Sequence, residues 1–123
     1  MMASPEHDLQ VIVTRFLTIA MPPEIVWTAV DHGAGKMSAR SAGQRKARGV
    51  KRGQADYRFV LPPHGRSAEI ELKVKGTYQS TAQEAWEAGI EASGGLYRVC
   101  RSLGEVELAL LDWGVRLRAT AIT

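Results

Sequence analysis

An uninterrupted alternation of apolar and charged residues over positions 68–75 constrains the fold of this chain more than any other feature of its sequence. The apolar members are Ala68, Ile70, Leu72 and Val74, and the charged members are Glu69, Glu71, Lys73 and Lys75. This period of two is typical of a half-buried β-strand, in which successive side chains point to opposite faces. We therefore expect the apolar residues to face the core, and Glu71 and Lys73 to lie one pleat apart on the other face. A carboxylate beside an ammonium group on a rigid strand is a candidate metal-and-base pair.

A second strand is predicted immediately upstream, at residues 53–61, with Asp56 near its start. The segment Pro62-Pro63-His64-Gly65 between the two strands is a typical turn sequence. The two strands therefore form a hairpin in this interpretation, and the hairpin brings Asp56 close to Glu71 and Lys73.

Helical periodicity and capping residues predict four helices, at residues 5–20, 38–48, 80–93 and 102–113. Capping boxes are expected at Ser80–Gln83 and Ser102–Glu105. Further strands are predicted at residues 25–30, which should be buried, at 96–100, and at 115–119 as a short terminal strand. Because the strand–helix–strand passage from Glu69 to Cys100 needs a crossover, two strands should be parallel. The prediction is a single domain over residues 1–123, with an α/β fold in which helices flank a mixed β-sheet.

Seven of the sixteen lysine and arginine residues lie between His32 and Ala55, in a window that contains no acidic residue. They are Lys36, Arg40, Arg45, Lys46, Arg48, Lys51 and Arg52. Such a basic segment, in a chain whose formal net charge is only +3, points to a polyanionic partner such as nucleic acid. A solvated helix face or loop is the alternative.

The composition excludes several other classes of protein. The single cysteine, Cys100, excludes an intramolecular disulfide and a cysteine metal cluster, and its apolar neighbours place it in the core. The most apolar N-terminal stretch is interrupted by Pro22-Pro23, so it is unsuited to span a membrane, and nothing resembles a signal peptide. We therefore expect a cytoplasmic protein without a membrane partner.

The combination of Asp56 with Glu71-Leu72-Lys73 on adjacent strands resembles the signature of the PD-(D/E)XK nuclease superfamily, and within it the VRR-NUC family of virus-type replication-repair nucleases. The resemblance extends over about residues 5–118. Further matching positions are Glu6 and Gln10 in the first helix, Gly49 and Gly53 before the aspartate, Ser80 and Gln83 after the Glu-x-Lys motif, and the turn at Gly94-Gly95. One position departs from the family pattern, because Ala55 stands where a proline usually precedes the aspartate.

This resemblance implies a restriction-endonuclease-like fold and a metal-dependent DNA endonuclease. The metal would be held by Asp56, Glu71 and the carbonyl of Leu72, with Glu6 approaching from the first helix. Magnesium is expected because it takes few protein oxygen ligands and keeps several waters, and Mn²⁺ should substitute for it.

The same resemblance gives roles to two further side chains and suggests a biological setting. Lys73 would orient or deprotonate the attacking water, and Gln83 would help to place Lys73 or the substrate. The partner would be duplex or branched DNA, the assembly a homodimer, and the setting phage or bacterial replication, repair or recombination.

Alternatives remain open at this stage. The chain could be a nucleic-acid-binding module with the nuclease fold and little or no catalysis, or a subunit that needs a partner protein. Individually, Asp56 could cap a turn or pair with an arginine, and Glu71 and Lys73 could form an exposed ion pair of little consequence. Gln83 could serve only its capping box.

Overall fold

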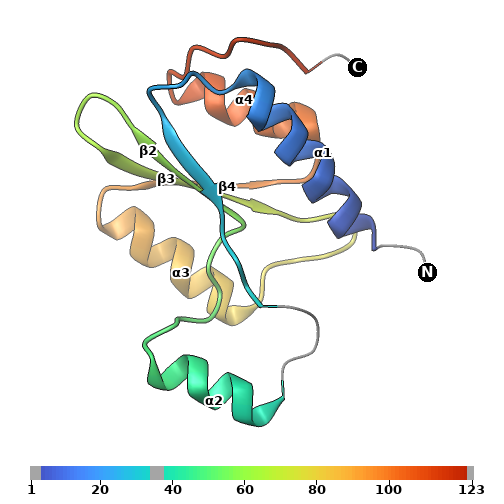
Figure 1. Ribbon diagram of the computed structural model, residues 1–123, viewed down its shortest axis with the longest axis vertical. Coiled ribbons are helices and arrows are strands. Elements are labelled where there is room, and N and C mark those ends of the chain that lie inside the picture. The colour runs from blue at the N-terminus through green and yellow to red at the C-terminus, as the bar shows by residue number, and fades with distance from the viewer. Residues whose placement is uncertain (1–3, 34–37, 122–123) are drawn as a thin grey trace.

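The chain folds into a four-stranded mixed β-sheet with helices on both faces, as the computed structural model of Figure 1 shows for residues 4–33 and 38–121. The helices are α1 (Pro5–Ala20), α2 (Ala39–Ala47), α3 (Thr81–Ala92) and α4 (Leu103–Asp112). The strands are β1 (Val26–Ala29), β2 (Tyr57–Leu61), β3 (Arg66–Leu72) and β4 (Leu96–Cys100). Within these described ranges, none of the helices combines the length and the apolar character needed to cross a bilayer.

The strands lie in the order β1-β2-β3-β4, so the chain adds each new strand next to the previous one. The pairs β1–β2 and β2–β3 are antiparallel, and Tyr57 lies opposite Ile70 in the central hairpin. The pair β3–β4 is parallel, with α3 as the crossover between its strands. The mixed sheet, the hairpin and the parallel pair are therefore confirmed.

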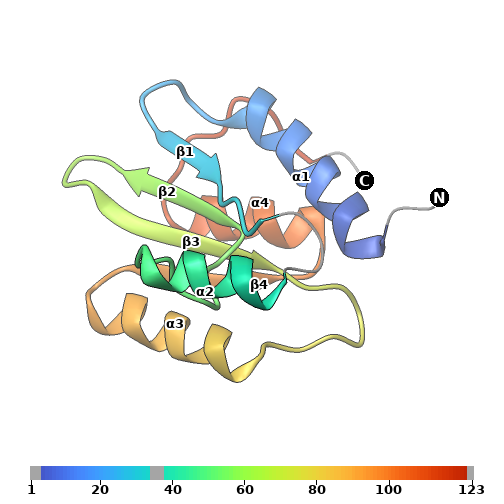
Figure 2. The same cartoon turned by 60° about the horizontal axis from the view of Figure 1, so that its bottom comes forward.

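The core lies between one face of this sheet and the helices α1 and α4, which pack side by side (Figures 1 and 2). In β3 the core face consists of Ala68, Ile70 and Leu72, each at most 1% exposed. The alternation in the sequence thus predicted the core face correctly. The strand ends at Leu72, earlier than predicted, but the backbone N–H of Lys73 still donates to the carbonyl of Cys100 at 3.0 Å.

The opposite face of β3 is also buried, which corrects the prediction of a half-buried strand. Glu69 and Glu71 are each 1% exposed, because α3 covers this face. Glu69 is fully paired there: its Oε1 accepts from Trp86 Nε1 at 2.8 Å, and its Oε2 accepts from Arg58 Nε at 3.1 Å. Alternation determines which way a side chain points, but not whether another element covers it.

The strand β1 and the C-terminal segment 115–119 also differ from prediction. Strand β1 is an exposed edge strand instead of a buried one, since Val26 is 70% exposed and Val60, opposite it, is 42% exposed. Residues 115–119 form no strand. The backbone N–H of Arg118 donates to the carbonyl of Ala20, so this segment is held beside the end of α1 and not at a sheet edge.

The predicted helix starts are correct, with one exception in detail. Ser80 and Gln83 form a complete capping box at α3. At α4 the Ser102 hydroxyl accepts from Glu105 N–H, but the Glu105 carboxylate accepts from Arg101 N–H. The second capping box is therefore not reciprocal, because Glu105 caps the preceding backbone N–H instead.

A close backbone contact explains one of the two glycines that precede Asp56. Gly53 has a φ of +81°, and an added Cβ would overlap the backbone carbonyl of Ala82 in the first turn of α3. Gly49, which follows α2, has a similar φ of +89° but no atom within 4 Å of such a Cβ. Both positions thus have a left-handed backbone that disfavours any other residue, but only Gly53 also has a steric contact that excludes a side chain.

We expect Gly53→Ala to lower the free energy of unfolding clearly more than Gly49→Ala. Gly49→Ala, the control, should lower the free energy of unfolding by about 1–2 kcal/mol, because alanine disfavours the left-handed backbone at this position. Gly53→Ala adds the displacement of the α3 backbone to this loss. Urea denaturation of both variants measures the difference, and equal losses would contradict the importance of the contact.

Candidate active site

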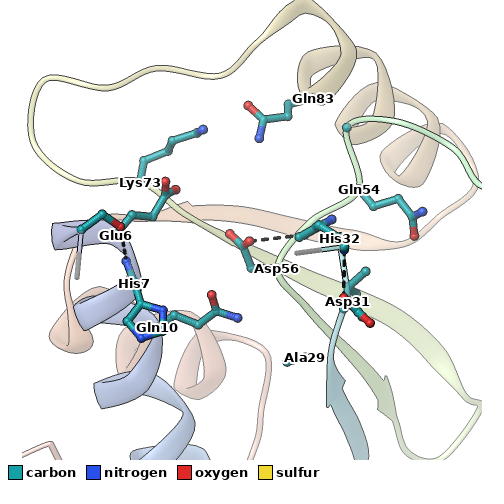
Figure 3. Close-up of a pocket in the computed structure, with 14 residues that line it drawn as sticks. Glu6, His7, Gln10, Ala29, Asp31, His32, Gln54, Asp56, Lys73 and Gln83 are labelled. Carbon is teal, nitrogen blue, oxygen red and sulfur yellow. Dashed lines mark hydrogen bonds and ion pairs between the residues drawn. The ribbon is translucent and has the colours of Figure 1, made fainter. Parts of the chain in front are cut away.

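A polar cleft of about 770 Å³ lies where β1 ends and β2 begins, bordered by the first turns of α1 and α3 (Figure 3). Four of the predicted site residues line it: Glu6, Asp56, Lys73 and Gln83. They come from four separate parts of the chain, so the fold brings together what the sequence separates. Glu71 and Leu72 lie in β3 just before Lys73 and are buried.

Asp56 is fixed by its backbone and by one of its two carboxylate oxygens. Its N–H donates to the carbonyl of Ile70 at 3.1 Å, and its own carbonyl accepts from Val30 N–H at 2.8 Å. Its Oδ2 accepts from the N–H of Leu72 at 2.7 Å. Its Oδ1 points to His32, whose Nε2 is 3.4 Å away (Figure 3). Among the described residues, Asp56 neither caps a turn nor pairs with Arg52 or Arg58, and Arg58 pairs with Glu69 instead, so the structure does not support either structural alternative.

Glu71 is held by one oxygen and unsatisfied at the other. Its Oε1 accepts from the hydroxyl of Tyr97 at 3.0 Å. Its Oε2 is buried and has no hydrogen-bond partner among the described residues, although Lys73 Nζ lies 3.5 Å away. Lys73 is only 12% exposed and Glu71 1%, so this is a buried pair and not the exposed one considered above.

Burial raises the pKa of Glu71, because the charged form loses its hydration. The Tyr97 hydrogen bond and the Lys73 charge oppose this effect, while the charge of Asp56 adds to it. Burial also raises the pKa of Tyr97, so its hydroxyl keeps its proton and acts as the donor to Glu71. A buried carboxylate oxygen with no donor, near a second carboxylate, is a site that a cation would stabilise.

The remaining predicted residues lie around this pair. Figure 3 shows Glu6 reaching from the first turn of α1 toward Lys73, and Gln83 extending from α3 toward the cleft. The Oε1 of Gln83 accepts from Ser80 N–H at 2.8 Å as part of the capping box. The capping and cleft positions are therefore compatible, and the side-chain NH₂ of Gln83 is the group that can donate into the cleft.

The cleft contains residues that the sequence did not suggest, and His32 is the most prominent. It follows β1, and its hydrogen bond with Asp56 raises the pKa of its imidazole. Asp31, His7 and Gln54 also line the cleft. Tyr97 was predicted only as part of an apolar strand. His32 follows β1, and Asp56 directly precedes β2. Because β1 and β2 pair antiparallel, the end of one strand lies beside the start of the other, and this pairing brings His32 to Asp56.

The donor set of the cleft fits a hard divalent cation with few protein ligands. Among residues 4–33 and 38–121, no three side chains of the types His, Cys, Asp and Glu are close enough together to form a preformed metal cage. Asp56 lies near enough to Glu71 for its charge to raise the pKa of Glu71, and the orphaned Oε2 of Glu71 is the specific observation in favour of a metal. Magnesium is often bound by one or two carboxylates and keeps its waters, so this pair is sufficient.

The basic residues form an arm that leads into the cleft. Helix α2 projects away from the sheet beyond α3 and has no buried residue (Figure 1). Six of the seven predicted DNA-binding residues lie on or after it: Arg40, Arg45, Lys46, Arg48, Lys51 and Arg52. Lys36 falls outside the described residues. The arm joins the cleft at Gly53 and Gln54, which line it.

Comparison with solved structures identifies the same fold in two chains described as "VRR_NUC domain protein" and "VRR_NUC domain". The first has a TM-score of 0.65 at 18% sequence identity, covering 92% of this chain and 90% of that chain. The second has a TM-score of 0.54 at 19% identity, covering 89% of this chain and 97% of that chain. No protein-family model and no curated protein matches the sequence. The chain thus has the fold of VRR-NUC nuclease domains, as its resemblance predicted.

The raised pKa of Glu71 predicts a specific pH dependence of stability for the metal-free protein. The folded state holds this proton more tightly than the unfolded state, whose reference pKa is 4.5. The contribution of Glu71 to the free energy of unfolding is therefore fully present below the unfolded pKa and is lost as pH rises through the folded pKa. Glu71→Gln cannot titrate and lacks this contribution.

We expect the difference in unfolding free energy, wild type minus Glu71→Gln, to fall as pH rises from about 4 to about 8. Denaturant titrations in a chelator at several pH values measure it. A difference that stays constant would mean that the carboxylate is not perturbed by its burial.

Proposed function

We propose that this chain is a metal-dependent DNA endonuclease that hydrolyses phosphodiester bonds. The observation that carries the proposal is that Asp56 lies near Glu71, beside Lys73, with one buried Glu71 oxygen left without a donor. The VRR-NUC fold is consistent with this chemistry.

Asp56, Glu71 and the carbonyl of Leu72 would hold the metal, with Glu6 contributing directly or through a water. Asp56 offers Oδ1, since its Oδ2 is engaged by Leu72 N–H, and Glu71 offers Oε2, since its Oε1 is engaged by Tyr97. Bound Mg²⁺ or Mn²⁺ would neutralise charge on the phosphate and lower the pKa of a coordinated water. Each of these two oxygens also faces a basic group, His32 Nε2 at 3.4 Å from Asp56 Oδ1 and Lys73 Nζ at 3.5 Å from Glu71 Oε2, with which a bound ion would share it.

The protein side chains would supply the remaining requirements. Lys73 lies at the cleft surface with its ammonium group beside Glu71, where it can orient the attacking water or neutralise the scissile phosphate. Gln83 can donate its side-chain NH₂ to the same phosphate or water. Lys73 directly follows β3 and Gln83 lies in the first turn of α3, and the Trp86–Glu69 hydrogen bond joins these two elements, which favours a fixed reacting geometry.

DNA is the proposed substrate because the basic arm runs directly into the cleft. Contacts from α2 and from Lys51 and Arg52 to phosphates would position DNA without reading its sequence. We therefore propose selection of branched or junction DNA by structure, in phage or bacterial replication, repair or recombination. A homodimer stays a prediction from the resemblance.

We expect wild-type protein to cleave DNA only when Mg²⁺ or Mn²⁺ is present. Asp56→Asn and Lys73→Ala should each lower the cleavage rate by about a hundred-fold or more, because each removes a group that acts on the reacting atoms. The assay compares matched linear duplex, single strand, flap and four-way junction substrates.

The control for this assay is Asp112→Asn, which removes a half-exposed carboxylate of α4 that pairs with Arg98. It should cleave like the wild type. Binding of DNA without cleavage under every metal condition would favour a binding module or a missing partner protein.

We expect divalent metal to raise the melting temperature of the wild type and to do so less in Asp56→Asn. Tyr97→Phe should weaken metal affinity by about ten-fold or more, because the hydroxyl that orients Glu71 would be lost. Calorimetric titration of Mg²⁺ and Mn²⁺ into each protein measures this directly.

Tyr57→Phe is the matched control for the loss of a buried hydroxyl. The Tyr57 hydroxyl donates to the Gln10 carbonyl at 2.9 Å and lies 2.7 Å from Thr14 Oγ1, so its hydrogen bonds are to α1 and not to Asp56 or Glu71. This variant should lose stability and keep its metal affinity. Equal metal affinity in Tyr97→Phe and wild type would refute the orienting role of Tyr97.

A further inference from the structure

The loop that joins β3 to α3 carries a strongly exposed aromatic side chain and connects two residues that line the cleft. Tyr78 is 78% exposed, more than any other large apolar side chain in the described part of the chain. The loop begins directly after Lys73 and ends at Ser80, the N-cap of the helix that carries Gln83. Lys73 and Gln83 both line the cleft, and Tyr78 lies midway between them in the sequence, so the loop connects two cleft residues although its own residues 74–80 do not line the cleft.

Hydrogen bonds from the half-buried Arg101 hold this loop in place. Its Nη1 donates to the carbonyls of Val74 and Thr77, each at 2.8 Å. The Thr77 hydroxyl also donates to the Val74 carbonyl at 2.8 Å. On the α3 side, Gln79 Nε2 donates to Glu87 Oε1 at 3.0 Å. The backbone on both sides of Tyr78 is therefore fixed.

Arg101 also sets the position of the aromatic ring. Its guanidinium carbon lies 5.4 Å from the centroid of the Tyr78 ring, in a cation–π contact. The ring is thus anchored and still mostly exposed to solvent. An anchored aromatic ring loses little conformational entropy when a planar ligand stacks on it. The exposed Lys75, three residues before Tyr78, adds a second positive charge to this loop.

An exposed aromatic ring flanked by basic groups is the arrangement with which proteins bind the bases of single-stranded DNA. In a continuous duplex each base face is covered by its neighbours, so a ring outside the helix has no base to stack on. A ring on a loop that connects two cleft residues can stack only on a base that is unpaired near the scissile phosphate.

We propose that Tyr78 is a stacking platform for an unpaired DNA base next to the cleavage site, and thereby a specificity-determining residue for branched DNA. The inference rests on the proposed function, because that proposal puts the DNA backbone in the cleft. It goes further by naming the structural feature of the substrate that is recognised. The contact is made by the ring face, so the tyrosine hydroxyl is dispensable.

The test separates binding from cleavage by using a chelator, so that no DNA is cut. A flap substrate is prepared in a series in which a single abasic site is moved along the unpaired strand near the branch. Binding of each substrate by wild type, Tyr78→Ala and Tyr78→Phe is measured by fluorescence anisotropy. Val26→Ala is the matched control, because Val26 is a 70% exposed apolar residue at the end of β1 remote from the cleft.

We expect one position of the abasic site to weaken wild-type binding by about five-fold or more, the equivalent of a single base stack. Tyr78→Ala should weaken binding of the intact flap by a similar factor and show no further loss with that abasic site. Tyr78→Phe and Val26→Ala should behave like the wild type.

Two results would overturn the proposal. The first is an abasic penalty that is equal in wild type and Tyr78→Ala, or absent in both. The second is a loss in Tyr78→Phe as large as in Tyr78→Ala, which would assign the contact to the hydroxyl and a phosphate. Because these measurements need no cleavage, a protein that stacks a base but never cuts DNA would refute the proposed endonuclease and leave only the base-stacking role of Tyr78 standing.

Discussion

The burial of two carboxylates on one face of β3 is the constraint on which the rest of the structure depends. A carboxylate removed from water is costly unless donors replace the lost hydration. Glu69 receives two donors, Trp86 from α3 and Arg58 from β2, and so ties the helix to the sheet. Glu71 receives only Tyr97 and a lysine at 3.5 Å. Two residues of the same type, on the same face of one strand, thus differ in what remains for chemistry: Glu69 is satisfied, and Glu71 has an oxygen available.

The central position of β3 in the sheet allows both neighbouring strands to contribute to the site. From the antiparallel side, Asp56 accepts the N–H of Leu72 and donates its own N–H to Ile70. From the parallel side, Tyr97 donates to Glu71. A shift of one residue in either register would turn Glu71 into the apolar core, so sheet pairing and site geometry are specified by the same hydrogen bonds. The core under the other face, packed against α1 and α4, therefore fixes the register that the site needs.

Much of this arrangement was predictable from local patterns, and the rest depends on tertiary contacts. The alternation of residues 68–75 identified the core face of β3. The turn sequence at residues 62–65 predicted the hairpin, and with it the approach of Asp56 to Glu71 and Lys73. The burial of Glu71 was not predictable, because it depends on α3, whose own pattern does not say which sheet face it covers. His32 was missed because no local signal tells which strand pairs with β1. Glu105 was misassigned because two backbone N–H groups, those of Arg101 and Ser102, lie within its reach.

The first turn of α3 links the three parts that the proposals assign to DNA. Gly53, at the base of the basic arm, packs directly on the backbone of Ala82 in this turn, and Asp56 follows three residues later. The loop that carries Tyr78 enters the same turn through Ser80. The arm, the carboxylate and the loop that carries the aromatic ring thus all connect to the first turn of α3. A DNA that contacts all three must match fixed separations between its phosphates and an unpaired base. Recognition of this kind selects the shape of a branch, because neither phosphates nor base faces distinguish one sequence from another.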